Sequence, residues 1–151
     1  MSRVLLPGAN GKVGHELRRS LAGLGEIILA TRSGVLDGGI ANEVADFDQP
    51  ESLVALVGCI SPDLVVNAAA YTVVDRAGDD VDAAFRANAE VPGQLARACA
   101  ARDALFAHYS TDYVFDGRHS SPYRPDDDTA PLGVYGESKL VGRHMAPECV
   151  G

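Results

Sequence analysis

The sequence predicts an α/β fold, a doubly wound parallel sheet with helices on both faces. Short apolar runs alternate along the chain with segments in which apolar residues recur every three or four positions. This alternation is typical of parallel strands joined by crossover helices. A glycine-rich turn at residues 8–14 lies between the first apolar run and the first helical segment. The 151 residues are enough for one domain with a core, and we expect residues 1–151 to form it.

The first half of the chain supplies three expected strands and two expected helices. The strands are residues 3–7, residues 26–31 and a short third strand at residues 43–45. Asp48 is expected to cap the second helix, in which Pro50 lies in the first turn. The first helix is indicated by apolar residues at helical spacing: Val13, Leu17, Leu21 and Leu24.

The second half continues the alternation. Residues 63–67 and 104–109 are apolar enough for buried strands, and a helical region between them covers residues 79–102. Pro92 lies inside this region and is expected either to bend the helix or to divide it. Residues 112–131 are rich in proline and aspartate and are expected to form an ordered loop, followed by a helix over residues 132–145.

The glycine-rich turn has the sequence GANGKVG and indicates a phosphate-binding loop of the Rossmann type. One glycine of the loop permits the tight turn, another lets backbone amides approach a diphosphate, and a third permits close packing of helix on strand. The following helix adds partial positive charge at its N-terminus. The spacing is GxxGxxG rather than GxGxxG, so its position directly after the first strand carries the prediction of a bound dinucleotide.

The end of the second strand indicates which dinucleotide is bound. An acidic residue there would bind the ribose 2′-hydroxyl of NAD(H), but the sequence has Thr31, Arg32 and Ser33. A guanidinium beside two hydroxyls suits a 2′-phosphate, so NADP(H) is favoured and NAD(H) is the alternative. Arg32 as a solvated loop residue is the competing interpretation.

Tyr135 and Lys139 lie four residues apart on the last expected helix and therefore share one face. Reduction of a carbonyl group needs an acid that protonates the oxygen, and a tyrosine can serve if a nearby cation lowers its pKa. Ser110 and Thr111 follow the strand at residues 104–109, at the carboxyl edge of the sheet where ligands bind. A hydroxyl at this edge can orient the substrate oxygen.

Four segments together resemble the dTDP-4-dehydrorhamnose reductase family of the extended short-chain dehydrogenase/reductase superfamily. They are GANGKVG at residues 8–14, VNAAAYTVVD at 66–75, STDYVFDG at 110–117 and PLGVYGESK at 131–139. The resemblance implies NADPH-dependent reduction of the 4-keto group of dTDP-4-dehydrorhamnose or of a related dTDP-4-keto-6-deoxysugar. It implies a catalytic set of Thr111, Tyr135 and Lys139, with Thr111 and Asp112 close to the sugar nucleotide.

Cofactor-binding residues follow from the loop, the end of the second strand and the resemblance taken together. Phe47 and Tyr109 have an alternative as core aromatic residues, and Asp112 has one as a hydrogen-bond acceptor within its loop. The expected set is Gly8, Asn10, Gly11, Lys12, Val13, Gly14, Thr31, Arg32, Ser33, Asp46, Phe47, Ala69, Ala70, Tyr71, Tyr109, Tyr135 and Lys139.

Members of this family are longer than this chain. We therefore expect a C-terminally truncated sheet that lacks the substrate-binding C-terminal portion, with a homodimer or a complementing C-terminal partner as candidate assemblies. The alternative function is a non-catalytic NADP-binding regulatory module or an inactive reductase homologue.

Composition excludes several other classes. Thirteen basic and 21 acidic residues give a net charge of −8, which argues against nucleic acid or an anionic membrane as a partner. The four histidines lack paired metal-ligand spacing, so no metal site is expected. Three scattered cysteines and a start without an apolar leader favour a cytoplasmic protein, with Cys99 as a core residue.

Overall fold

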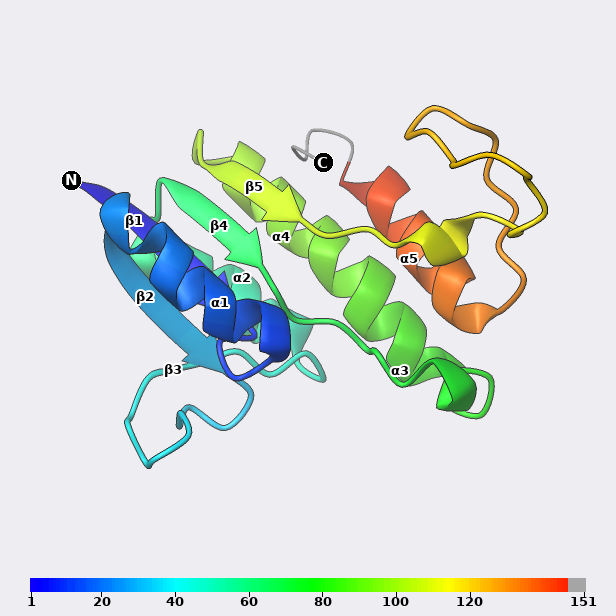
Figure 1. Ribbon diagram of the computed structural model, residues 1–151. Coiled ribbons are helices and arrows are strands. Elements are labelled where there is room, and N and C mark those ends of the chain that lie inside the picture. Colours follow the sequence, from blue (N-terminus) through cyan, green and yellow to red (C-terminus); the bar gives the residue numbers. More distant parts are fainter. Residues whose placement is uncertain (147–151) are drawn as a thin grey trace.

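The computed structural model of the protein describes residues 1–146 and contains one parallel sheet in this range (Figure 1). The order of the strands is β3-β2-β1-β4-β5. This arrangement confirms the predicted Rossmann-like α/β fold. The strand bounds are Ser2–Pro7 for β1, Gly25–Thr31 for β2, Glu43–Val44 for β3, Leu64–Asn67 for β4 and Leu105–His108 for β5.

Helices cover both faces of the sheet, as the alternation predicts. Helix α1 (Lys12–Ser20) packs on one face over Val4, Leu6 and Val66. Helices α2 (Pro50–Ile60) and α4 (Val91–Ala100) lie on the opposite face. The core beneath them includes residues of both helices and of three strands: Leu5, Leu53, Val57, Val65, Leu95 and Phe106. Helix α5 (Val134–Met145) lies beside α4 (Figure 1).

Two expected details in the first half of the chain are wrong. Helix α1 ends at Ser20, and Leu24 is exposed after a 3₁₀ turn at Leu21–Gly23. Asp48 is not the cap of α2, because the N-cap residue is Gln49 and the Asp48 carboxylate forms ion pairs with Arg32 and Arg86.

The long helical region is continuous rather than divided at Pro92. It runs through α3 (Val81–Phe85), a π-helical turn (Arg86–Glu90) and α4. Proline has no amide hydrogen for the carbonyl four residues earlier, which is that of Asn88. The π-helical turn lies directly before this position, and such turns inside α-helices are frequent at functional sites.

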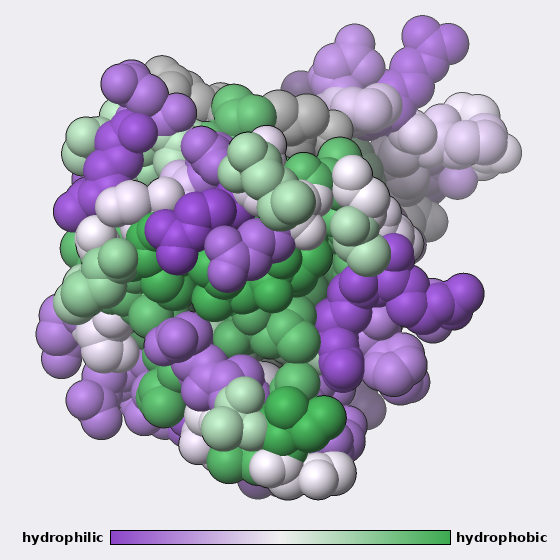
Figure 2. All heavy atoms as spheres, turned by 90° about the vertical axis from the view of Figure 1, so that its left-hand side faces the viewer, coloured by the Kyte–Doolittle hydropathy of each residue, from purple (hydrophilic) through white to green (hydrophobic). Residues whose placement is uncertain are grey.

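The side of the molecule that carries β1 and β2 has apolar side chains over its middle, surrounded by hydrophilic ones (Figure 2). The exposed large apolar residues in the first half of the chain include Leu24, Ile40 and Val44. Cys99 is buried on α4, as predicted, and Cys149 lies outside the described residues. Between residues 1 and 146, no helix is long and apolar enough to cross a membrane.

Candidate functional site

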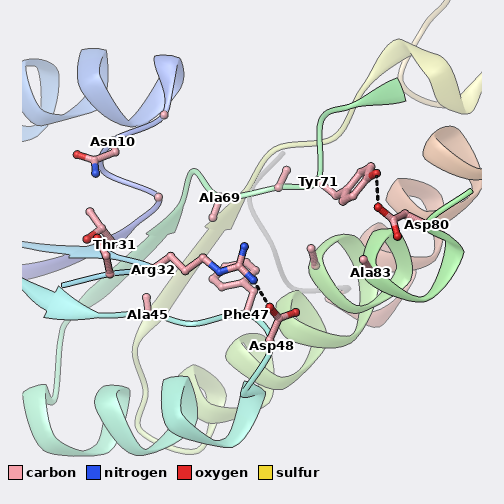
Figure 3. Close-up of a pocket in the computed structure, with 15 residues that line it drawn as sticks. Asn10, Thr31, Arg32, Ala45, Phe47, Asp48, Ala69, Tyr71, Asp80 and Ala83 are labelled. Atoms are coloured by element: carbon pink, nitrogen blue, oxygen red, sulfur yellow. Dashed lines mark hydrogen bonds and ion pairs between the residues drawn. The ribbon is translucent and has the colours of Figure 1, made fainter. Parts of the chain in front are cut away.

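A cavity of about 550 Å³ opens where β1 ends and α1 begins (Figure 3). Its wall comes from the glycine loop, the ends of β2 and β4, the loop before α2, and α3. Most of the expected cofactor-binding residues therefore lie around one space. The lining residues are Gly8, Asn10, Gly11, Thr31, Arg32, Ser33, Ala45, Phe47, Asp48, Ala69, Ala70, Tyr71, Asp80, Ala83 and Ala87.

The glycine loop has the geometry that a phosphate-binding turn requires. Gly8 has φ +81°, and a Cβ built on it would lie 2.5 Å from the backbone nitrogen of Ala69. A Cβ on Gly14 would lie 2.1 Å from the carbonyl oxygen of Gly8. These two positions require glycine, because any side chain would push α1 or the β4 loop away.

Gly11 is different, because it is the N-cap of α1 and has ordinary extended backbone angles. A Cβ on Gly11 would meet only the Gly8 carbonyl oxygen at 3.3 Å. The missing side chain therefore leaves space above the first turn of α1, where the backbone amides have no acceptor within the helix. Lys12 and Val13 lie in this turn with exposed side chains, so their expected contribution comes from backbone amides.

The Arg32 side chain lies at the rim of the cavity but is already paired. Its Nε is 3.5 Å from the Asp46 carboxylate, and its terminal nitrogen pairs with Asp48. The other oxygen of Asp48 lies 2.9 Å from an Arg86 nitrogen. Figure 3 shows the Arg32 and Asp48 side chains pointing toward each other. Asp48 is not among the residues predicted for the site, because nothing in the sequence shows that it faces Arg32.

The opposite side of the cavity carries Tyr71 and Asp80. The Tyr71 hydroxyl donates a hydrogen bond to the Asp80 carboxylate at 3.3 Å. Desolvation, and then the Asp80 charge, raise the pKa of Tyr71. Phe47 also lines the cavity while packing against the core, so it combines the two roles considered for it.

Asn88 connects this cavity to α5. It is fully buried in the π-helical turn; its side-chain oxygen accepts from the Tyr71 amide at 2.9 Å, and its nitrogen donates to the Tyr71 carbonyl at 3.1 Å. The same nitrogen donates to the Ser138 hydroxyl at 3.1 Å, and Ser138 donates to the Tyr135 carbonyl at 2.9 Å. Asn88 is not among the predicted site residues, although an asparagine among apolar helical positions is a usable signal.

Tyr135 lines a second cavity, of about 450 Å³, between α5 and the loop after β5. Its ring meets that of Tyr113 edge to face, with centroids 5.3 Å apart. The wall also includes Asp112, Phe115 and Tyr123. The loop is ordered around the Tyr123 hydroxyl, which accepts from the Arg118 amide at 2.9 Å and donates to Asp116 at 2.6 Å.

Lys139 lies on the same helix as Tyr135 but is only 3% exposed. Its ammonium donates to the carbonyl of Tyr109 at 2.5 Å, and burial lowers its pKa to about 8. Next to it in the fold, His108 faces Asn67, with Nδ1 3.2 Å from the amide nitrogen. Burial and then the Lys139 charge lower the pKa of His108 to about 4.

The remaining expected residues lie near these cavities without lining them. Thr111 caps a 3₁₀ turn (Asp112–Val114): its hydroxyl accepts from the Tyr113 amide and lies 3.3 Å from the Asp112 carboxylate. Tyr109 is 45% exposed, so its side chain is not the core aromatic considered as an alternative. Within residues 1–146, no group of three or more His, Cys, Asp or Glu side chains is arranged to hold a metal.

Comparison with known proteins identifies relatives along nearly the whole chain. The sequence model of the RmlD substrate binding domain matches residues 2–148. A dTDP-4-dehydrorhamnose reductase of Burkholderia thailandensis is 48% identical over 149 residues, covering 99% of this chain and 47% of the relative. One from Escherichia coli K12 is 42% identical over 145 residues, covering 96% of this chain and 46% of the relative.

Solved structures agree with the sequence comparison. A dTDP-4-dehydrorhamnose reductase of Clostridium acetobutylicum superposes with a TM-score of 0.86 at 30% identity, covering 97% of this chain and 51% of that one. One from Bacillus anthracis, solved in complex with NADP, gives a TM-score of 0.84 at 29% identity and covers 99% and 50%. The chain thus spans about half the length of the relatives it matches.

Proposed function

Because this chain belongs to the RmlD substrate binding domain family, we propose that it is the cofactor-binding part of a reductase. The reaction would be NADPH-dependent reduction of the 4-keto group of dTDP-4-dehydrorhamnose or of a related dTDP-4-keto-6-deoxysugar. The relatives described above are named dTDP-4-dehydrorhamnose reductases. NADP(H) is the favoured cofactor, and a relative of this family has been solved with NADP.

The cavity at the glycine loop fits a dinucleotide. Its volume is about 550 Å³, within the usual range for small-molecule sites. Gly11 leaves open the space above the amides of α1, and Thr31, Arg32 and Ser33 lie at the end of β2, where the adenosine ribose binds in such folds. When bound, the reduced nicotinamide supplies the hydride.

One link between the two cavities carries the proposal. Asn88 binds both backbone groups of Tyr71, which lines the cofactor cavity, and also Ser138 on α5. Ser138 lies between Tyr135 and Lys139 on that helix. The wall of the cofactor cavity is therefore joined through one buried side chain to the helix that carries the proposed acid.

The side chains would share the remaining work. Tyr135 would hold the proton at its phenol oxygen and deliver it to the carbonyl oxygen of the sugar. Lys139 would supply the positive field beside this phenol and bind the nicotinamide ribose. Thr111 would orient the substrate oxygen, and Asp112, on the wall of the second cavity, would contact the sugar nucleotide.

The test is to incubate the chain with NADPH and dTDP-4-dehydrorhamnose and to follow the loss of NADPH absorbance. The proposal predicts oxidation that depends on the sugar nucleotide and falls to background in Tyr135→Phe. Equal rates in the wild type and Tyr135→Phe would contradict it.

A second candidate is a cofactor-binding module without turnover. It is favoured by the position of Lys139, which is buried, donates its hydrogen bond to the Tyr109 carbonyl and lines neither cavity. NADPH binding without oxidation would support the module. Turnover that is restored when a C-terminal partner is added would support the reductase instead.

A further inference from the structure

One carboxylate at the rim of the cofactor cavity holds two arginines that come from distant parts of the chain. Asp48, in the loop before α2, uses one oxygen for Arg32 at the end of β2 and the other for Arg86 in the π-helical turn. Asp46 adds a second carboxylate to Arg32, at 3.5 Å. Arg32 is thus part of an ionic network rather than a free cation.

The network lies where the two nicotinamide cofactors differ. Arg32 and Asp48 both line the cavity, together with Thr31 and Phe47 (Figure 3). The residues that end the second strand of such a sheet contact the adenosine ribose at its 2′ position. This position carries a hydroxyl in NADH and a phosphate in NADPH.

Asp48 treats these two groups in opposite ways. Its carboxylate accepts a hydrogen bond from a hydroxyl but repels a phosphate. It also pairs with a terminal nitrogen of Arg32, one of the nitrogens through which a guanidinium binds a phosphate with two hydrogen bonds. The second strand lacks the acidic residue typical of NADH enzymes, and Asp48 places a carboxylate in its vicinity from another loop.

We propose that Asp48 is a specificity-determining residue of the cofactor cavity, which lowers the preference for NADPH over NADH by competing with the 2′-phosphate for Arg32. Arg86 positions the carboxylate for this competition. The inference rests on the proposed function, because it assumes that a nicotinamide dinucleotide occupies this cavity.

The solvent exposure of Arg32 and Asp48 limits how much Asp48 can change the affinity for either cofactor. Arg32 is 74% and Asp48 is 48% exposed at the side chain, so water screens the pair and the phosphate can displace Asp48. Removing the charge should therefore change the affinities by about three- to tenfold rather than by orders of magnitude.

The experiment compares Asp48→Asn with the wild type in fluorescence titrations with NADPH and NADH. Glu51→Gln is the matched control, because it removes one negative charge from an exposed position in the first turn of α2, outside the cavity wall. The titrations are repeated with adenosine 2′,5′-bisphosphate and 5′-AMP, which test the adenosine end of the cavity without the nicotinamide.

The proposal predicts that Asp48→Asn binds NADPH and the bisphosphate about three- to tenfold more tightly. NADH and 5′-AMP should bind equally well or more weakly, and Glu51→Gln should keep the wild-type ratio. An unchanged ratio in Asp48→Asn, with both cofactors binding, would overturn this inference alone. Failure of the wild type to bind either cofactor would overturn the proposed function together with it.

Discussion

The ammonium of Lys139 on α5 donates a hydrogen bond to the backbone carbonyl of Tyr109, 2.5 Å away and 30 residues earlier in the chain. This bond fixes α5 to the end of β5 and places a buried cation beside His108. Burial lowers the pKa of Lys139 to about 8 and, with the Lys139 charge as the second cause, that of His108 to about 4. The same features therefore affect stability as well as the proposed chemistry.

Replacing Lys139 with methionine should stabilise the chain at neutral pH. The folded pKa of about 8 lies below the ordinary 10.5, so the unfolded chain binds the proton more tightly. With respect to Lys139, the folded chain is most stable above pH 10.5, where the amine is neutral. It loses this stability as the pH falls through 8 and the buried amine becomes charged. Lys139→Met should raise the free energy of unfolding at pH 7 by about 1 to 3 kcal/mol in urea titrations. An advantage that does not shrink between pH 7 and pH 10 would contradict this account.

His108 should contribute to unfolding in acid. Its folded pKa of about 4 lies below the ordinary 6.5, so its contribution is full above pH 6.5 and is lost as the pH falls through 4. The free energy of unfolding that is lost in this way amounts to about 3 kcal/mol. His108→Gln should flatten the decline of the unfolding free energy between pH 7 and pH 4. Parallel curves for the two proteins would show that His108 is not the titrating group.

Gly14 should be intolerant of any side chain. In Gly14→Ala the new Cβ would lie 2.1 Å from the Gly8 carbonyl oxygen, so α1 must move off the sheet. We expect a loss of about 2 to 4 kcal/mol of stability in denaturant titrations. Gly23→Ala is the control, because a Cβ there meets no atom within 4 Å and its expected change is about zero or slightly stabilising. Equal stability of the two variants would refute the close packing.

Asn88 should matter more than its partner Ser138. Asn88→Ala leaves the partly buried amide and carbonyl of Tyr71 without their side-chain partners and should cost about 2 to 4 kcal/mol. Ser138→Ala removes only one neighbouring hydroxyl and should cost about 1 kcal/mol. Thermal unfolding of both variants measures the difference, and a reversed order would contradict the role given to Asn88.

The fold could be predicted from the sequence because each of its main signals is local. The strands β1, β2 and β4 each contain a run of consecutive apolar residues, which is typical of strands in a parallel sheet covered on both faces. Gly8 marks a turn that needs positive φ, and the spacing of Tyr135 and Lys139 correctly predicts one helix for both. The ends of the helices were predicted less accurately, because Leu24 continues the apolar pattern of α1 although this helix ends at Ser20.

The candidate site was harder to predict, because its contacts join residues far apart in sequence. Asp48 has the sequence features of a helix cap, but Arg86, 38 residues later, is one of its actual partners. Asn88 and Ser138 are separated by 50 residues. Lys139 could be identified as a catalytic candidate, whereas its bond to the Tyr109 carbonyl depends on how α5 lies against β5.

The most direct test of the account is the affinity of Gly11→Val for NADPH. The backbone of Gly11 is extended, and its Cβ would meet only the Gly8 carbonyl oxygen at 3.3 Å, so the variant should fold with a stability within about 1 kcal/mol of the wild type. The valine side chain would fill the space above the α1 amides, where the diphosphate is expected. Fluorescence titration should show saturable NADPH binding by the wild type and at least about tenfold weaker binding by Gly11→Val. Folded Gly11→Val that binds NADPH as tightly as the wild type would contradict the account.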